Sequence, residues 1–271
     1  MKKIFTFWEP RESMPEYIRL CLETWRRNLC DYEVEVLDYE RLGEYLSREE
    51  IESVLCREMS LAMQADCIRA ALLKKHGGIW LDADTIAVKP MDAKLFNADV
   101  VMISSRREGA IVNYGAFIYA ARENTAFMNE WHRQILPRVE LAKKLYGSVA
   151  RRICHPRQWK EVRKWNYVEN AIIDPLATKA KAGEYATIDK ALAYALPEED
   201  LLVNGQAKNP LEAYRRYWLS DGEIDEIMER TMSIIMLHNS FMDDGYRKMS
   251  EQEFLATPTR LAKLLKCILR M

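Results

Sequence analysis

The sequence predicts an α/β fold in which helices flank a central sheet of mostly parallel strands. At the N-terminus a strand at 4–8, a helix at 17–25 and a strand at 32–37 follow one another, and this order in so short a span favours parallel strands. Further along, a helix stops at two glycines and runs directly into a short apolar strand at 79–81. The length of 271 residues fits one α/β domain with a modest accessory region.

The first three elements are predicted from their side-chain periods. The strand at 4–8 is built from β-branched and aromatic residues, and Pro10 and Pro15 mark a loop and a helix start. Apolar residues then recur at helical spacing, at Tyr17, Ile18, Cys21, Leu22 and Trp25. In 32–37, valines alternate with glutamates, which is the period of a half-buried strand.

The central helix is expected to end at Gly77-Gly78. Its apolar positions Ala65, Ile68 and Leu72 lie at helical spacing, and two lysines near its end suit the negative end of the helix dipole. Gly77-Gly78 can supply a left-handed C-terminal cap. The chain should therefore leave the helix at the glycines and enter the strand at 79–81.

This strand runs into the triplet Asp82-Ala83-Asp84. If the segment stays extended, the two aspartates share one face and the alanine points away. Two neighbouring carboxylates repel unless a cation joins them, and oxygen ligands favour Mg²⁺, Mn²⁺ or Ca²⁺. The alternative is an exposed turn without a ligand. On the preceding helix, Asp66 and Arg69 lie three apart and so share a face. Together these residues could bind a phosphate, a sugar hydroxyl and a cation.

The pattern Ala65-Asp66-x-x-Arg69, followed by Leu72-Leu73-x-x-His76-Gly77-Gly78-Ile79-Trp80-Leu81-Asp82-Ala83-Asp84, resembles the DXD-containing sugar transferases. These include bacterial capsular polysaccharide synthesis proteins, α-mannosyltransferases and, more distantly, the glucosylating clostridial toxins. The resemblance implies a GT-A type fold, with a single Rossmann-like nucleotide-sugar-binding domain, a mostly parallel central sheet and a helical accessory region.

The resemblance also implies an activity. A metal-dependent glycosyltransferase would move a sugar from a nucleotide-diphosphate sugar, UDP-linked rather than GDP-linked, with Mn²⁺ or Mg²⁺ and with retention of anomeric configuration. The acceptor would be a carbohydrate or a lipid-linked oligosaccharide in capsule or lipopolysaccharide synthesis. Asp84 would bind the metal directly and Asp82 the metal or the ribose. Arg69 would add positive charge at the diphosphate, and Asp66 would accept hydrogen bonds from the donor sugar.

Three more site residues are expected from the resemblance. Trp8 closes the first strand, where the family stacks an aromatic ring on the base, although the residue pattern without the resemblance favours a place for Trp8 in the core. Asn113 begins the apolar segment 113–120 and would contact a sugar hydroxyl, although asparagine beside glycine is also typical of turns. His238 follows the apolar strand 233–237 and would be a metal ligand, which suits manganese better than magnesium. Its alternative is a structural histidine.

The second half of the chain is expected to serve the acceptor. The domain divides into a nucleotide-sugar-binding half, 1–130, and an acceptor half, 131–271. From 133 to 164 the chain is basic and aromatic, which suits a solvated helical face, an acceptor lobe or contact with anionic lipid headgroups. Residues 260–270 form an amphipathic helix, either packed on the domain or lying at a membrane interface.

Composition limits the remaining classes. The chain is 49% hydrophobic and 30% charged, with a net charge of −1, which argues against nucleic acid as a partner. Six cysteines without metal-ligand spacing are expected to be reduced and mostly buried. With neither a signal peptide nor a membrane span expected, the protein is predicted to be cytoplasmic, with contact at the inner face of the membrane left open. An aspartate-dependent phosphatase and a nonenzymatic carbohydrate-binding module are the alternative functions.

Overall fold

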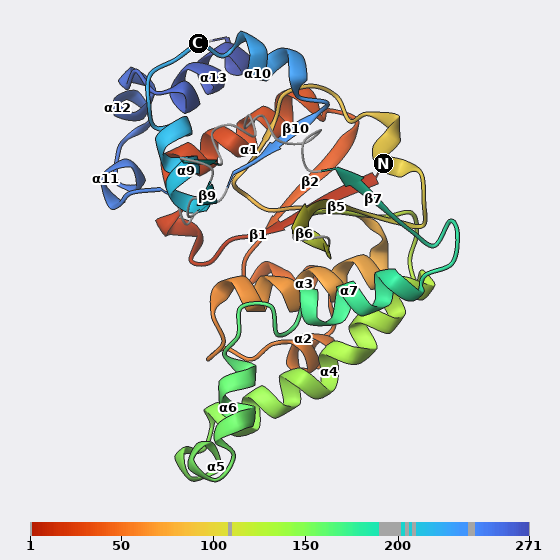
Figure 1. Ribbon diagram of the computed structural model, residues 1–271. Helices are drawn as coiled ribbons and strands as arrows, with labels where there is room; N and C mark the ends of the chain where they lie inside the picture. Colours follow the sequence, from red (N-terminus) through yellow and green to blue (C-terminus); the bar gives the residue numbers. More distant parts are fainter. Residues whose placement is uncertain are drawn as a thin grey trace.

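A six-stranded sheet lies between two layers of helices in the computed structural model (Figure 1). The structure describes residues 2–107, 110–189, 202–203, 206–207, 210–237 and 242–270. One layer contains α1, α12 and α13, and the other contains α3, α4 and α7. The two smaller helices α5 and α6 extend from the far end of α4 (Figure 1).

The sheet has the strand order β2-β1-β3-β6-β5-β7. Its strands are β1 (Lys2–Phe7), β2 (Tyr32–Leu37), β3 (Gly78–Leu81), β5 (Val100–Arg107), β6 (Ala110–Ala120) and β7 (Tyr185–Asp189). Only β6 among these six runs against its neighbours. Two separate antiparallel pairs join β4 (Thr85–Ala87) to β10 (Ile234–Met236) and β8 (Leu202–Val203) to β9 (Gln206–Ala207). The α/β class and the mostly parallel sheet are therefore confirmed.

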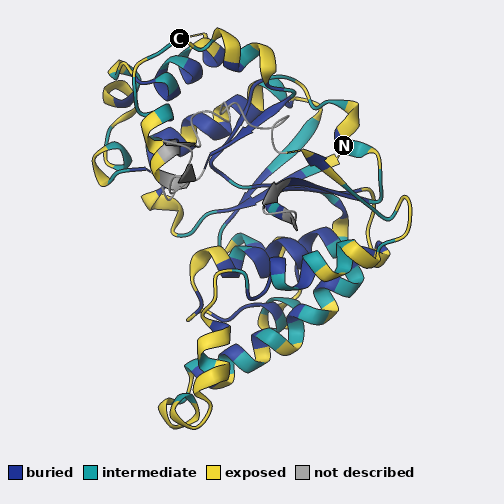
Figure 2. Cartoon of the chain, in the orientation of Figure 1, coloured by how far each residue is buried: buried dark blue, intermediate teal, exposed yellow. Residues whose placement is uncertain are grey.

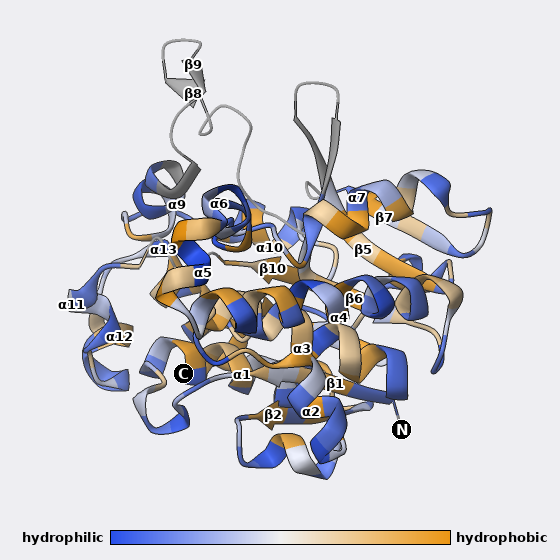
Figure 3. Ribbon diagram, turned by 90° about the horizontal axis from the view of Figure 1, so that it is seen from below, coloured by the Kyte–Doolittle hydropathy of each residue, from blue (hydrophilic) through white to orange (hydrophobic). Residues whose placement is uncertain are grey.

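The helices cover both faces of the sheet. They are α1 (Glu16–Asn28), α2 (Arg48–Val54), α3 (Leu61–His76), α4 (Ala126–Tyr146), α5 (Val149–Cys154), α6 (Pro156–Val162), α7 (Asn170–Lys179), α9 (Pro210–Trp218), α10 (Asp225–Arg230), α11 (Asp244–Arg247), α12 (Glu251–Ala256) and α13 (Arg260–Leu269), with short 3-10 turns η1 (Arg11–Ser13), η2 (Arg41–Glu44) and η3 (Ala93–Phe96). The central strands are hydrophobic and buried, whereas the outer helical surfaces are more polar and more exposed (Figures 2 and 3).

Alternation along the strands produces two hydrophobic cores, one on each face. Ile4 packs toward α1, and its neighbour Phe5 packs toward α3. The same alternation places Ile79 and Leu81 on the α1 side and Trp80 on the α3 side. Each face of the sheet is therefore covered, as parallel sheets require.

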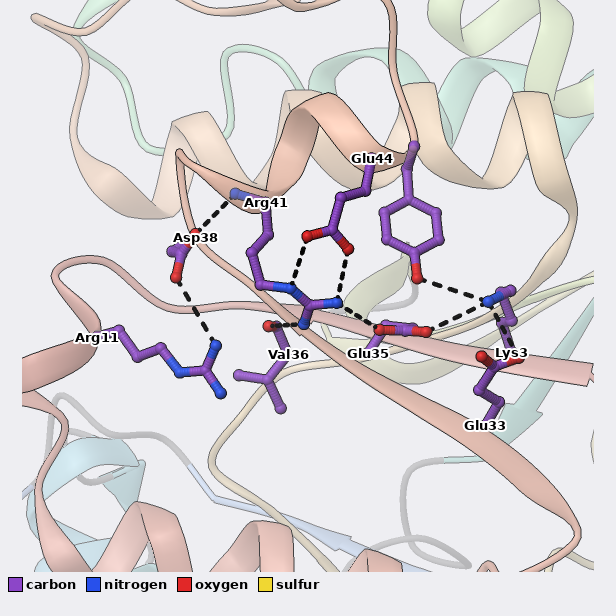
Figure 4. Close-up of polar contacts among 9 residues, drawn as sticks. Lys3, Arg11, Glu33, Glu35, Val36, Asp38, Arg41 and Glu44 are labelled. Carbon is purple, nitrogen blue, oxygen red and sulfur yellow. Dashed lines mark hydrogen bonds and ion pairs between the residues drawn. The ribbon is translucent and has the colours of Figure 1, made fainter.

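The first two strands are also joined by a polar cluster at their surface (Figure 4). Glu35 of β2 accepts bonds from Lys3 Nζ at 3.2 Å and Arg41 Nη2 at 2.9 Å. Burial opposes its negative charge, but hydrogen bonds from Tyr45, Arg41 and Lys3 outweigh burial and lower the pKa of Glu35 to about 2. The cluster thus attaches η2 to the edge of the sheet.

The C-terminal helix α13 is a packed helix. Its apolar stripe is buried against α1 and α12, at Leu261, Leu264, Leu265, Ile268 and Leu269. The alternative, in which this stripe lies in a membrane interface, is therefore wrong. None of the helices within the described residues is long and apolar enough to cross a membrane.

All six cysteines are free, as expected, but only three of them are buried. Cys30, Cys154 and Cys267 are exposed, so the prediction of mostly buried thiols is half wrong. Neither β7 nor α7, which continues through Pro175, was expected from the residue pattern.

Candidate active site

The helix α3 ends as its sequence predicts. Gly77 caps it with φ of 63°, and its N–H donates to the Leu73 carbonyl at 2.9 Å. A Cβ at Gly77 would lie 2.7 Å from the backbone of Arg122, so both the positive φ and the close approach require glycine. The cap sends the chain directly into β3, whose C-terminal end carries Asp82.

The triplet Asp82-Ala83-Asp84 forms a turn rather than an extended segment. The Thr85 N–H donates to the Asp82 carbonyl at 3.0 Å, which closes a four-residue turn. The expectation that both aspartates share a face by strand alternation is therefore wrong.

The two carboxylates meet different layers of the fold. Asp82 stays on the α3 side and accepts a bond at Oδ1 from Trp80 Nε1 at 2.8 Å. Asp84 is 8% exposed and lies on the α1 side, where burial and the Asp84 charge together raise the pKa values of Tyr17 and Cys21. Only Asp82, whose side chain is 39% exposed, is open to solvent to a large extent.

A buried arginine cluster lies beside Asp82. The guanidinium of Arg69 forms ion pairs with Asp66 on the same helix, with Asp82 at 3.3 Å and with Glu169 at 3.1 Å. Its Nη1 also donates to the Gly115 carbonyl at 2.6 Å. The structure thus confirms that Asp66 and Arg69 share a face and that the Gly-Gly turn brings them to the first aspartate.

Glu169 is the member of this cluster that sequence reasoning missed. It immediately precedes α7, and nothing in its local sequence marks it, because its partners come from α3 and β6. Burial raises its pKa, and Arg69 opposes this while the charge of Asp82 adds to it. Oε1 of Glu169 and Nε of Arg69 are both buried without a hydrogen-bond partner in the part of the chain that the structure describes. Such atoms are costly unless water or a ligand binds them.

Gly115 allows the cluster to reach the sheet. A Cβ at this position would lie 1.7 Å from Glu169 Oε1 and 2.7 Å from Arg69 Cζ. The reversed direction of β6 brings Gly115 to the end of β3, where the Asp82 N–H donates to the Ala116 carbonyl at 2.9 Å. Any side chain at Gly115 would displace the guanidinium or the carboxylate.

Asn113 lies on the same face of β6, two residues from Gly115. It is 1% exposed, its Nδ2 donates to Asp174 at 2.8 Å, and its Oδ1 accepts from the hydroxyl of Tyr185. Burial raises the pKa values of both Asp174 and Tyr185. These three residues line an open cavity of about 830 Å³ between α7 and β7. A contact between Asn113 and a sugar stays a prediction. It would require the Asn113 amide to bind the sugar while it also bonds Asp174 and Tyr185.

The remaining expected residues come from neighbouring strand ends. Trp8 follows β1 and is half-buried against the α1-side core, so one part of its ring stays accessible at the edge where β3 ends. His238 lies outside the described residues and stays a prediction. Its neighbour Leu237 donates its N–H to the Asp84 carbonyl at 3.2 Å.

The charges of the Arg69 cluster are unbalanced. The three carboxylates of Asp66, Asp82 and Glu169 share the one guanidinium of Arg69. Within the described residues, Oδ2 of Asp82 takes part in no bond, and no three His, Cys, Asp or Glu side chains are grouped to hold a metal ion. Mg²⁺ commonly takes one or two carboxylates and completes its shell with water and substrate phosphates, and Oδ2 of Asp82 could supply one such ligand.

A family comparison assigns the chain. The model of the capsular polysaccharide synthesis protein family matches residues 1–137, just over half of the 271 residues. The chain belongs to this family. The match covers β1 to β6 and therefore includes the Asp82 turn, Asp66, Arg69 and Gly115. No curated protein matches the chain.

Several solved structures are distantly similar to this family member. The PaToxG glycosyltransferase is 18% identical with a TM-score of 0.39, over 66% of this chain and 68% of that one. A glycosyltransferase involved in glycosylation of the major capsid of PBCV-1 is 14% identical with a TM-score of 0.39, over 99% and 98% of the two chains. The glycosyltransferase GlyE of Streptococcus pneumoniae TIGR4 is 9% identical with a TM-score of 0.44, over 100% of this chain and 60% of that one.

Proposed function

We propose that this member of the capsular polysaccharide synthesis protein family is a glycosyltransferase, which moves a sugar from a nucleotide-diphosphate donor to a carbohydrate acceptor. The observation that carries the proposal is the Arg69 cluster, which holds Asp82 at the C-terminal end of a central strand. Open α/β sheets bind ligands outside the carboxyl ends of their strands. The acceptor would be a surface-polysaccharide precursor, free or lipid-linked.

The turn would bind the diphosphate end of the donor. Asp82 would use its Oδ2, because Oδ1 is held by Trp80 and Arg69, and Asp84 would be the second ligand, with His238 proposed as a third. When bound here, Mn²⁺ or Mg²⁺ would neutralise the charge that grows on the departing diphosphate. The partly accessible ring of Trp8 would stack on the nucleotide base, with uracil proposed ahead of guanine.

Arg69 acts mainly by positioning in this proposal. Its side chain is 5% exposed, and its guanidinium already contacts three carboxylates and the Gly115 carbonyl. It would therefore hold Asp66 and Asp82 in place while adding positive charge near the phosphates. The Oδ1 of Asp66 is paired with Arg69, which leaves Oδ2 to accept a hydrogen bond from a donor-sugar hydroxyl.

The sugar and the acceptor would lie along β6. Asn113 and its cavity are on the same sheet face as the Arg69 cluster, about 7 Å further along the strand. Hydroxyl, amide and carboxyl groups line this cavity at Tyr185, Asn113 and Asp174, and such groups suit sugar hydroxyls. We propose retention of the anomeric configuration, with the leaving phosphate taking the acceptor proton, and name no protein base.

The test is donor hydrolysis and thermal stabilisation with a panel of UDP- and GDP-sugars, each with Mn²⁺, Mg²⁺ or chelator. One nucleotide sugar is expected to stabilise the protein and to be hydrolysed only with metal. Asp84→Asn should abolish both responses. Asp31→Asn is the matched control, because Asp31 is exposed just before β2, at the opposite edge of the sheet.

Two results would contradict the proposal. Full activity of Asp84→Asn in chelator would show that neither the turn nor a metal takes part. Release of phosphate from sugar phosphates, without any response to nucleotide sugars, would favour a phosphatase, and binding of sugars without turnover of any donor would favour a carbohydrate-binding module.

A further inference from the structure

A small helical projection stands apart from the body of the molecule. Residues 147–165, named here the α5–α6 tip, follow the last turn of α4 and contain α5 and α6. Figure 1 shows the tip at the end of α4 that is furthest from the α1 layer, and Figure 2 shows that most of its surface is exposed. Most of its residues are exposed to solvent.

The tip exposes large apolar side chains. Ile153 is 73% exposed, Trp165 70% and Val149 62%, and the only other large hydrophobic residue exposed within the described part of the chain is Leu61, at 45%. Val149 and Ile153 are four apart on α5 and therefore neighbours on one side of it. Aliphatic and aromatic groups concentrated on one projection indicate a binding surface, whereas scattered single residues would not.

These side chains are outside because other residues fill the interior of the tip. The ring of Trp159 packs edge-on against Tyr146, with centroids 4.9 Å apart. The guanidinium groups of Arg152 and Arg163 lie 5.1 and 5.4 Å from the Trp159 ring centroid. The tip is thus ordered around Trp159 without burying Val149 or Ile153.

The tip is also strongly basic. It has six basic residues and one acidic residue, Glu161, which gives it a net charge of +5, whereas the whole chain has −1. Lys164 is paired with Glu161 at 2.7 Å. Arg151, Arg157 and Lys160 form no ion pair with any described residue, so their charge is available to a partner.

We infer that the α5–α6 tip docks the protein on a membrane surface that carries anionic lipid headgroups. Basic side chains near such a surface are attracted to it, and tryptophan favours the interface between headgroups and acyl chains. Insertion of the exposed valine and isoleucine into the bilayer removes apolar surface from water, which is favourable. An acidic polysaccharide or a nucleic acid could bind the basic side chains, but it would make no favourable contact with the exposed aliphatic side chains. The inference does not depend on the proposed catalytic function, because no tip residue belongs to the Arg69 cluster.

Flotation of the full chain with lipid vesicles tests the inference. Binding is expected to vesicles of phosphatidylcholine with phosphatidylglycerol, to be absent with phosphatidylcholine alone, and to weaken in 1 M salt, where screening is nearly complete. The double change Arg157→Gln and Lys160→Gln should lower partitioning roughly thirtyfold. The double change Val149→Ser and Ile153→Ser keeps the charge and should lower it about tenfold.

Matched controls separate the tip from the rest of the surface. Lys266→Gln with Arg270→Gln removes two positive charges from the region of α13, and Leu61→Ser removes the exposed apolar side chain outside the tip. Both should leave partitioning unchanged. Because the altered residues are exposed or partly exposed, thermal unfolding should stay at the wild-type temperature in every variant.

A dye on Cys154 gives an independent readout. Cys154 is exposed on α5, and Cys30→Ser with Cys267→Ser removes the other exposed thiols. The dye emission should shift to the blue only with anionic vesicles. Absence of vesicle binding, or equal binding by wild-type and tip variants, would overturn the inference. So would self-association or capture of an acidic polysaccharide or nucleic acid that the tip variants abolish, in the absence of vesicle binding.

Discussion

Replacing Arg69 by methionine should destabilise the protein by about 3–5 kcal/mol at neutral pH. The Arg69 side chain is 5% exposed, and its guanidinium pairs with Asp66, Asp82 and Glu169, of which Asp66 and Glu169 are themselves buried. Methionine fills similar space without charge, so the loss reflects buried carboxylates left without a cation, for which about 3–5 kcal/mol is typical. This is a large part of the roughly 5–15 kcal/mol that stabilises a domain.

The loss should depend on pH in a defined direction. Without the guanidinium, the buried carboxyl groups are more stable protonated, so their folded-state pKa values rise above the unfolded values near 4. A carboxyl group whose pKa is raised in the folded state stabilises the fold at pH values below its unfolded-state pKa. This contribution is lost as the pH rises through its folded-state pKa. The stability difference between wild type and Arg69→Met should therefore be smaller at pH 5 than at pH 8.

Urea unfolding followed by circular dichroism at both pH values measures this difference. Arg122→Met is the control, because Arg122 also forms a two-bond pair, with Asp99 at 2.6 and 2.9 Å, but its side chain is 63% exposed. An exposed pair contributes less than about 1 kcal/mol. Equal losses in the two variants, or an Arg69→Met loss that is independent of pH, would show that Arg69 does not stabilise buried carboxylates.

Three other substitutions test separate parts of the fold. Gly115→Ala should lower the free energy of unfolding by about 1–3 kcal/mol and remove any response to donor, because a Cβ has no room beside the cluster. Gly43→Ala is the control: its added Cβ would have nothing within 4 Å, so urea unfolding should be unchanged. Glu35→Gln should lower the free energy of unfolding by about 1–2 kcal/mol at pH 7, because the folded-state pKa of Glu35 is about 2. The stability that Glu35 contributes is lost as the pH falls from about 4.5 toward 2. An equal stability difference between wild type and variant at pH 3 and pH 7 would contradict the lowered pKa. Leu265→Ala should cost about 2–5 kcal/mol in the same assay, since the side chain is fully buried, and a neutral result would mean that α13 does not pack on α1.

The predictable part of the fold was set by short-range signals. The first strand, helix and strand follow from periods within each segment, and the predicted strand at 32–37 has the observed bounds Tyr32–Leu37. The end of α3 follows from one backbone requirement, because the residue that caps it, Gly77, has a positive φ that glycine adopts readily. Asp66 and Arg69 are brought together by helical spacing alone, which their ion pair confirms.

The unpredictable part depends on contacts between distant segments. The shared face of Asp82 and Asp84 was inferred from strand alternation, but β4 pairs with β10 and the chain must turn before reaching it. Glu169 lies far along the chain from Arg69 and gains its role only because α7 packs on β6. Periodicity carries no information about such pairings, so neither the turn nor Glu169 could be recognised from the sequence.

The charge of the Arg69 cluster has a consequence for the proposed reaction. In their ionised forms Asp66 and Asp82 exceed the charge of Arg69 by one unit, even when Glu169 keeps its proton. A free diphosphate would be repelled by this excess, because like charges in a low-dielectric site interact strongly. The donor should therefore bind weakly alone and tightly with a divalent cation, so that metal and nucleotide sugar each raise the affinity for the other by the same factor. Titration of UDP with and without Mn²⁺ measures that factor, and equal affinities would mean that the carboxylates are compensated by some other group.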